Sequence, residues 1–248
     1  MKVILAAAGY GTRMGELART KPKSLLEVGG IPVIEHCISR VVEIGEIDKI
    51  FVISNNKFFQ SFLDWKKKFH CRIDIEIIND GTNSNEKRLG TMGDIDYVLR
   101  ERNVNDDFLV INADNVFLLD LKSAYEDFID KKKTIVGIIN AENLEEAKKK
   151  GNPKLDDNLR VINFKEKDPN TTSTLSTIGI YFFPKTIRET IREYLALGNS
   201  PDKSGDFIAW LYKKEEVYGH YFGDSKGKLF DIGSPNSYKE ANDFFGRF

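Results

Sequence analysis

The sequence is poor in cysteine, in long apolar runs and in excess charge of either sign. Two cysteines occur among 248 residues, too few for a disulfide framework, so a reducing compartment such as the cytoplasm is expected. The apolar stretch that opens the chain ends at Gly9 and is too short to cross a membrane, and no later stretch is long enough. The formal net charge of -1 gives no overall attraction to nucleic acid, so an anionic ligand would need a local cluster of cations.

Histidine is also scarce, and this narrows the chemistry that the chain can support. The three histidines, at positions 36, 70 and 220, have no metal-ligand spacing with each other or with Cys37 and Cys71. We assign no role to these histidines, and we expect both cysteines to be free, buried thiols.

Apolar runs that alternate with amphipathic segments predict an α/β fold with a Rossmann-like, doubly wound and mostly parallel sheet. The expected strands of the first half are Val3–Ala7, Lys49–Ser54, Asp74–Ile78, Asp107–Asn112 and Thr134–Asn140. The expected helices are Pro32–Ile44, Lys57–Lys68, Thr91–Arg100 and Leu121–Lys132, with Pro32 in a first helical turn. The second half predicts strands at Arg160–Lys165 and Ser176–Phe183, helices at Lys185–Leu195 and Gly205–Lys213, further short strands, and a final helix at Pro235–Phe245.

The length and the absence of a linker predict a single unit over residues 1–248. Within it we expect a nucleotide-binding half of about residues 1–133, and a smaller, β-containing half of about residues 134–248 for a second substrate.

The turn after the first strand carries the strongest chemical signal, because Gly9, Gly11 and Arg13 are followed by Lys21-Pro22-Lys23. Glycines let backbone N–H groups approach a ligand closely, and cations hold an anion, so a phosphate-binding loop is indicated. The dinucleotide fingerprint requires a third glycine where Met14 stands, and the Gly-Lys-Ser/Thr ending of a P-loop is absent.

These residues resemble the opening of the sugar-phosphate nucleotidyltransferases, which is Gly-x-Gly-Thr-Arg, then Lys-Pro-Lys, then Gly-x-Pro. The resemblance continues through Leu89-Gly90-Thr91, Asn112-Ala113-Asp114-Asn115, Phe164-Lys165-Glu166-Lys167, Ser176-Thr177-Ile178-Gly179-Ile180-Tyr181 and Phe230-Asp231-Ile232-Gly233-Ser234-Pro235. Two departures are Ala113, where the family usually has glycine, and Asp168, where it usually has proline.

The resemblance implies the nucleotide-diphospho-sugar transferase fold and transfer of a nucleoside monophosphate from a nucleoside triphosphate to a sugar 1-phosphate, with pyrophosphate leaving. It implies that Arg13 and Lys23 are catalytic cations and that Asp114 and Asp231 hold Mg²⁺. The residues implied to bind nucleotide are Ala6, Ala7, Gly9, Gly11, Thr12, Asn79, Gly90 and Thr91, and those implied to bind the sugar phosphate are Glu166, Lys167 and Gly179.

The chemistry itself fits this set of residues. A phosphate monoester has its second pKa near 6, so its oxygen is already a nucleophile at neutral pH and no general base is needed. The reaction needs alignment of two anions and neutralisation of charge on pyrophosphate, tasks that Mg²⁺ and fixed cations perform. Structural alternatives remain for several positions: the aspartates could cap turns, Arg13 and Lys23 could form surface ion pairs, Lys165–Asp168 could be a charged edge, and Gly179 could mark a bulge.

We expect dTTP or UTP and glucose 1-phosphate as the leading substrates. Guanylyl or cytidylyl transfer, to another sugar phosphate or to phosphocholine, is the alternative within this chemistry, because such enzymes share the glycine loop and the Lys-Pro-Lys segment. A non-catalytic sensor of nucleotide sugars is the alternative from another class, and a nicotinamide-dependent oxidoreductase is disfavoured by the missing glycine. From the length we expect no C-terminal acyltransferase-like repeat, and a homo-oligomer is compatible with the sequence.

Overall fold

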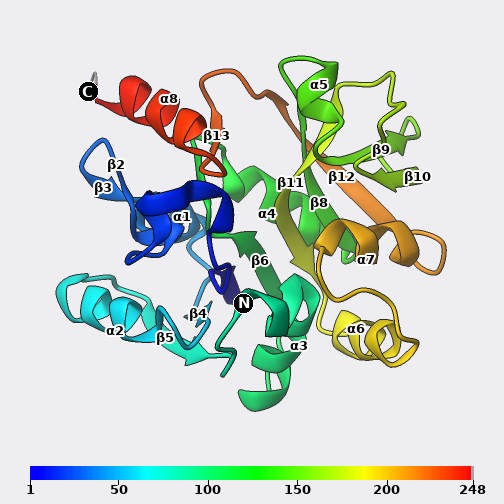
Figure 1. The fold of residues 1–248 in the computed structure, drawn as a ribbon. Coiled ribbons are helices and arrows are strands. Elements are labelled where there is room, and N and C mark those ends of the chain that lie inside the picture. Colours follow the sequence, from blue (N-terminus) through cyan, green and yellow to red (C-terminus); the bar gives the residue numbers. More distant parts are fainter. Residues whose placement is uncertain (247–248) are drawn as a thin grey trace.

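The structure, a computed structural model that describes residues 1–246, is built on one seven-stranded sheet (Figure 1). The strand order is β12 (Val217–Asp224), β8 (Thr134–Asn140), β11 (Leu175–Phe183), β6 (Phe108–Asn112), β1 (Lys2–Ala6), β4 (Lys49–Ser54) and β5 (Asp74–Asn79). Every neighbouring pair is parallel except the two pairs that contain β11, which runs antiparallel to both β6 and β8. The mostly parallel sheet expected from the sequence is confirmed.

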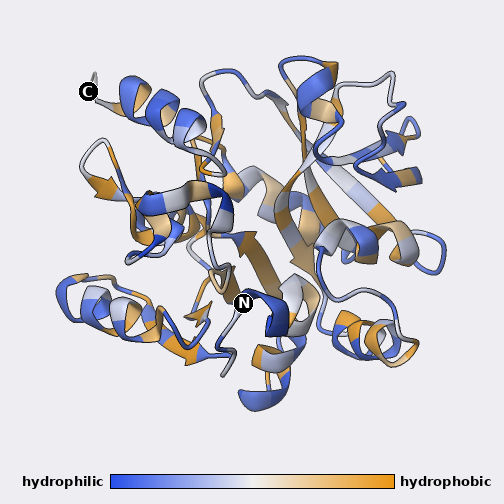
Figure 2. Cartoon of the chain, viewed as in Figure 1, coloured by the Kyte–Doolittle hydropathy of each residue, from blue (hydrophilic) through white to orange (hydrophobic). Residues whose placement is uncertain are grey.

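Helices cover both faces of this sheet, because successive side chains of each strand point to opposite faces. Val3 and Leu5 of β1 pack into a core with α1 (Val33–Ile44), α2 (Phe59–Lys68) and α4 (Leu121–Lys131). Ile4, between them, packs into a second core with α3 (Gly90–Glu101), α6 (Ile187–Ala196) and α7 (Ser204–Leu211). Figure 2 shows the hydrophobic colour gathered on the central strands, while the helices mix both colours. The fold is therefore doubly wound.

Helix α1 illustrates how the sequence directs these elements. Its buried side chains include Ile34, Cys37, Ile38 and Val41, which recur at helical spacing. Gly45 ends the helix with a φ of 87°, a conformation that favours glycine. The helix begins at Val33, one residue later than predicted, so Pro32 is the N-cap residue and not part of the first turn.

Short antiparallel pairs stand beside the main sheet. They are β2 (Glu27–Val28) with β3 (Ile31–Pro32), β7 (Asn115–Phe117) with β13 (Leu229–Asp231), and β9 (Gly151–Leu155) with β10 (Val161–Glu166). The remaining helices are α5 (Leu144–Ala147), α8 (Pro235–Phe245) and 3-10 turns at Thr12–Ala18, Lys23–Leu25 and Asn85–Lys87. Among the strands of these pairs, β10 is the one for which the sequence analysis gave bounds, at Arg160–Lys165.

Helix α8, near the end of the described chain, is hydrogen-bonded to the segment around residues 27–29. The Gly29 N–H donates to Asn242 Oδ1 at 3.1 Å, and the Tyr238 hydroxyl donates to the Glu27 carbonyl at 2.8 Å. Figure 1 shows α8 beside the β2–β3 hairpin. Ala241 of this helix and Ile232 share a third apolar cluster with Met14. The segment after β13 is thereby held against the glycine loop.

The proposed division near residue 133 does not interrupt the sheet, since β8, β11 and β12 share it with β1 and β6. The assignment of one ligand to each half remains a prediction. None of the described helices combines the length and apolarity that crossing a bilayer requires.

Candidate active site

The site forms where the carboxyl ends of β1 and β6 meet. Ala6 and Asn112 are register partners in the parallel ladder, so the loops that follow both strands emerge at one edge of the sheet. A pocket of about 150 Å³ opens there, and its lining includes Ala6, Ala7, Gly9, Lys23, Thr91 and Asp114. The structure thus brings together six of the residues that the sequence singled out.

The glycine loop is held in place by backbone geometry and by a buried asparagine. Gly11 has a φ of +65°, and a Cβ there would lie 2.7 Å from the Cβ of Ala18, so a larger residue does not fit. Asn55, fully buried, donates from Nδ2 to the Ala8 carbonyl at 2.7 Å. Its Oδ1 accepts from the Phe58 N–H at 3.1 Å, which fixes the amide orientation. Nothing in the sequence marked Asn55 as a support of this loop.

Lys23 and Asp114 form the ion pair at the floor of the pocket. Lys23 Nζ lies 2.6 Å from Asp114 Oδ2, and the lysine side chain is 12% exposed. Asn115 Nδ2 donates to the other carboxylate oxygen of Asp114 at 3.3 Å. Both predicted residues therefore face the loop, and the ion pair is internal to the site rather than on the open surface.

Asp231 is brought beside Asp114 by the small β7–β13 ladder. Asp231 is the register partner of Asn115, the residue after Asp114, and the Ile232 N–H donates to the Asp114 carbonyl at 2.8 Å. Two carboxylates that lie far apart in the sequence thus meet at the edge of the sheet.

The two carboxylates sit in a strongly charged environment. Desolvation of the carboxylate, followed by the negative charge of Asp114, raises the pKa of Asp231. The cations Lys150, Lys23 and Arg13 oppose this rise. Arg13, Lys150 and Asp231 also line one cavity of about 670 Å³.

The predicted nucleobase side contains a helix start and a loop. Gly90 has a φ of +77°, and a Cβ on it would lie 2.6 Å from the Pro201 carbonyl oxygen. The Thr91 N–H donates to the Asp202 carbonyl at 3.2 Å, so this amide is already engaged. The side chain of Asn79 donates to Asn56 Oδ1 and accepts from the Gly81 N–H, at 2.8 and 2.9 Å. Gly90 and Asn79 therefore shape loops around the pocket in this structure.

A pair of acidic side chains that the sequence analysis did not identify lies beside the same pocket. Asp94 of α3 lines the pocket and is only 7% exposed. Burial, followed by the charge of Asp80, raises the pKa of Asp94 to about 8, so the protonated form of Asp94 is favoured at pH 7. Thr82 donates to Asp80 from its N–H at 2.7 Å and from its hydroxyl at 3.0 Å. The loop after β5 thus brings one carboxyl group close to the carboxyl group of α3.

Glu166 and Lys167 lie at the end of β10, away from the glycine loop. A Cβ on Gly205 would lie 1.9 Å from Glu166 Oε2, so helix α7 packs closely on this carboxylate. Burial raises the pKa of Glu166, and burial also raises the pKa of nearby Tyr181 to about 12. Lys167 is exposed and has a φ of +53°, in the left-handed region that non-glycine residues seldom adopt.

Gly179 faces Asn112 at the centre of the sheet. Its φ is +72°, and a Cβ would lie 2.4 Å from Asn112 Nδ2. The β8–β11 register shifts between Thr177 and Tyr181, as a bulge requires. Gly179 therefore lies in a bulge, as the structural alternative expected. Its contact with the sugar remains a prediction. Asn112 Oδ1 is buried without a hydrogen-bond partner, which leaves an acceptor beside Asp114.

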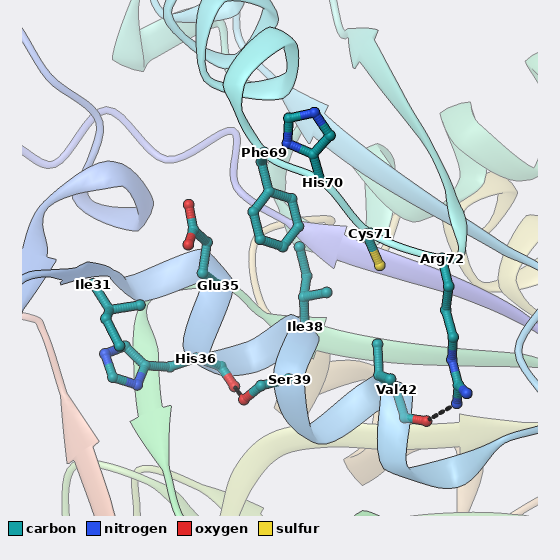
Figure 3. Close-up of a pocket in the computed structure, with 10 residues that line it drawn as sticks. All are labelled: Ile31, Glu35, His36, Ile38, Ser39, Val42, Phe69, His70, Cys71 and Arg72. Atoms are coloured by element: carbon teal, nitrogen blue, oxygen red, sulfur yellow. Dashed lines mark hydrogen bonds between the residues drawn. The ribbon is translucent and has the colours of Figure 1, made fainter.

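A separate pocket of about 570 Å³ lies between α1 and the segment that joins α2 to β5 (Figure 3). Its polar groups serve the fold: Glu35 accepts from Trp65 Nε1 at 2.8 Å, and Arg72 donates to the Val42 carbonyl at 2.8 Å. Cys71, half-buried, and His70 also line it, and none of the predicted site residues does. This pocket is distinct from the site at the strand ends.

The donor set at the strand ends fits a magnesium ion. Asp114 and Asp231 offer carboxylate oxygens, and Mg²⁺ is usually held by one or two carboxylates with phosphate oxygens and water completing the shell. Across residues 1–246 no group of three or more histidine, cysteine, aspartate or glutamate side chains forms a ready-made metal site.

Comparison with known proteins agrees with this geometry. The family model described as nucleotidyl transferase matches residues 1–247. A bifunctional protein GlmU from Methanocaldococcus jannaschii is 32% identical over 98% of this chain, and the match covers 54% of that protein. A protein from Sulfolobus acidocaldarius, named as a mannose-1-phosphate guanyltransferase by similarity, is 27% identical over 98% of this chain and 62% of its own length. The chain thus spans little more than half of these relatives.

Among solved structures, one from Bacillus anthracis, assigned as a glucose-1-phosphate thymidylyltransferase and bound to sucrose, superposes with a TM-score of 0.85. It is 20% identical and covers 100% of this chain and 96% of its own, so it supports the fold. With the family model matched over residues 1–247, and with the glycine loop, Lys23 and Asp114 at one edge of the sheet, the chain belongs to the sugar-phosphate nucleotidyltransferase family.

Proposed function

We propose that this chain transfers a nucleoside monophosphate from a nucleoside triphosphate to a sugar 1-phosphate, with dTTP or UTP and glucose 1-phosphate as the first pair to test. The observation that carries the proposal is the convergence of Lys23, Asp114 and Asp231 at the carboxyl ends of β1 and β6, beside the glycine loop. The names of the relatives favour different sugars and bases, so guanylyl transfer to mannose 1-phosphate is the second candidate.

In this reaction an oxygen of the sugar phosphate attacks the α-phosphorus of the triphosphate. The bond from that phosphorus to the bridging oxygen breaks, and pyrophosphate leaves with the electron pair. No proton has to be removed from the attacking oxygen at neutral pH, so the reaction does not require a histidine as general base. The work of the protein is to align the anions and to offset their charge.

The residues divide this work according to their positions. Backbone N–H groups of the glycine loop receive the triphosphate, and Arg13, which lines the larger cavity, offsets the charge that develops on pyrophosphate. Asp114 and Asp231 would hold Mg²⁺, which supplies further neutralisation of the phosphates. Lys23 is bound to Asp114 at 2.6 Å, and engagement of this carboxylate by a cation would free Lys23 for the α-phosphate.

The free thiols Cys37 and Cys71 are compatible with a reducing compartment, and we propose that the protein acts in the cytoplasm.

The test is pyrophosphate release with Mg²⁺, using dTTP, UTP, GTP, CTP and ATP against glucose, mannose and N-acetylglucosamine 1-phosphates. Asp114→Asn should lower kcat by about a hundredfold or more, because it removes a carboxylate charge proposed to hold the Mg²⁺ that neutralises the reacting phosphates. Asp64→Asn, on the exposed face of α2, is the control and should keep full activity. If no pair gives turnover while a nucleotide sugar binds tightly, the protein is a sensor and the proposal is wrong.

A further inference from the structure

Lys150 lies in the charged cavity and has no assigned role. It lines the cavity of about 670 Å³ together with Arg13 and Asp231. Lys150 directly precedes β9, which begins at Gly151.

The neighbours of Lys150 show that this cation is different from an ordinary surface lysine. Lys148 pairs with Glu145 at 2.6 Å and Lys149 pairs with Glu146 at 2.5 Å. Within residues 1–246 no carboxylate lies within ion-pair distance of Lys150 Nζ. A half-buried cation without a partner of this kind remains available to an anionic ligand.

The backbone connects Lys150 to Lys167. The Lys150 carbonyl accepts from the Lys167 N–H at 2.9 Å, and this bond helps to hold Lys167 at its φ of +53°. A non-glycine residue in this region is strained, and it persists where the surrounding structure fixes it. Gly151, the residue after Lys150, packs against Glu166, since a Cβ there would lie 3.1 Å from Glu166 Oε2. The two lysines thus belong to one rigid corner on the side proposed to bind the sugar phosphate.

Charge balance indicates what this corner binds. A sugar 1-phosphate is close to a dianion at neutral pH, and it has to approach an already negative triphosphate. The proposed function assigns Lys23 to the α-phosphate and Arg13 to the leaving pyrophosphate, so the incoming phosphate needs cations of its own. Two lysines match the charge of one phosphate dianion.

We propose that Lys150 joins Lys167 in binding the phosphate group of the acceptor sugar 1-phosphate. This assignment rests on the proposed function, and it adds a residue that the family motifs in this sequence do not contain. It also specifies that Lys150 acts on the acceptor and not on the nucleoside triphosphate.

The test compares Lys150→Gln with Lys149→Gln, a neighbouring lysine that lines the same cavity but is paired with Glu146. Steady-state rates are measured with the sugar 1-phosphate and the nucleoside triphosphate that the wild-type protein prefers in the panel above. Lys150→Gln should raise KM for the sugar phosphate about tenfold or more, since a charge-assisted hydrogen bond is lost. KM for the triphosphate should stay within about twofold, and Lys149→Gln should change neither value by more than about twofold.

Lys150→Arg keeps the positive charge, so its KM for the sugar phosphate should stay close to that of the wild-type protein. If the lysine side chain had only a structural role, the positive charge would not decide the value of KM. The assignment is overturned if Lys150→Gln and Lys149→Gln behave alike, or if Lys150→Gln raises KM for the triphosphate instead. In both cases the proposed function stands, because the wild-type protein turns over. Absence of wild-type turnover with every pair would overturn the proposed function and this assignment together.

Discussion

Two aspartates that line the pocket at the strand ends have different surroundings. Asp114 lies 2.6 Å from Lys23 Nζ, so a cation faces this carboxyl group. Within residues 1–246 Asp94 has no ion-pair partner, and burial, followed by the charge of Asp80, raises its pKa to about 8. The two side chains are therefore expected to differ in their response to pH.

Asp94 makes the stability of the fold depend on pH. The folded protein keeps the proton on Asp94 up to about pH 8, whereas the unfolded chain releases it near the ordinary aspartate pKa of 3.8. Between these values the folded state binds more protons, so its stability falls as the pH rises, and the loss is complete above about pH 8. Asp94→Asn cannot ionise and should remove this dependence, with a gain of up to a few kcal/mol at pH 9 and little at pH 4.

Urea unfolding at pH 4, 6 and 9 measures the effect. Asp96→Asn is the control, since Asp96 lies on the same helix and is 9% exposed but has a cation, Arg100, at 2.8 Å. This control should destabilise the protein at pH 6 and 9. Parallel pH profiles for the wild-type protein and Asp94→Asn would show that Asp94 is ionised in the folded state.

The sequence predicted those site residues that stand in recognisable local patterns. Gly9, Gly11 and Arg13 follow a strand directly, and Asp114 follows another, so the ends of parallel strands place them at one edge. Lys150 and Asp94 carry no such pattern, because their importance depends on which distant groups face them. Lys150 stands in a run of three lysines, and the ion pairs of Lys148 and Lys149 are what distinguish these two residues from it.

Among the elements, the β7–β13 pair and helix α8 determine where Asp231 lies. Asp231 ends β13, and Ser234, three residues later, caps α8 by accepting from the Ser237 N–H at 3.2 Å. The Ser237 hydroxyl in turn accepts from the Ser234 N–H at 3.1 Å. A secure helix start therefore fixes the chain on one side of the aspartate, while the ladder fixes it on the other.

Ser234→Ala should lower the free energy of unfolding by about 1 kcal/mol, as loss of an N-cap usually does, and should also raise the Mg²⁺ concentration needed for half-maximal activity. Asp120→Ala removes the cap of α4, whose side chain accepts from the Lys122 and Ser123 N–H groups at 3.0 and 3.2 Å. It should cost similar stability without a change in the Mg²⁺ requirement. An equal Mg²⁺ requirement in the two variants would show that the cap of α8 does not position Asp231.

Most long elements could be predicted because each repeats its own pattern over a sufficient length. Helix α8 begins and ends where the sequence placed it, since Pro235 follows a serine and marks the first turn. Strands β7 and β13 are three residues each, too short for any periodicity, and their pairing joins segments far apart in the chain. The sequence thus predicted that Asp114 and Asp231 act together only through the family resemblance.

Across the whole molecule, the sheet unites residues from both parts of the chain. Strand β11 lies between β6 and β8 and runs antiparallel to both. Hydrophobic patterns do not encode this order, because β11 is buried along nearly its whole length and has no polar face. The position of β11 beside β6 places Gly179, which we propose to contact the sugar, against Asn112. The class of fold was therefore predictable, while this arrangement required the structure.

Because the proposed site draws on loops from many elements, its ligand should stabilise the entire fold. A triphosphate with Mg²⁺, each well above its dissociation constant, adds about 2.7 kcal/mol at a hundredfold excess of ligand. For a domain of this size that corresponds to a rise in Tm of roughly 5–11 °C.

With a chelator in place of Mg²⁺ the rise in Tm should fall to a small fraction of this value, since Asp114 and Asp231 would then repel the phosphates. Thermal unfolding with dTTP or UTP, with and without the chelator, measures this difference. An undiminished rise in the chelator would show that Arg13, Lys23 and the glycine loop hold the triphosphate alone, and the two aspartates would then need another role.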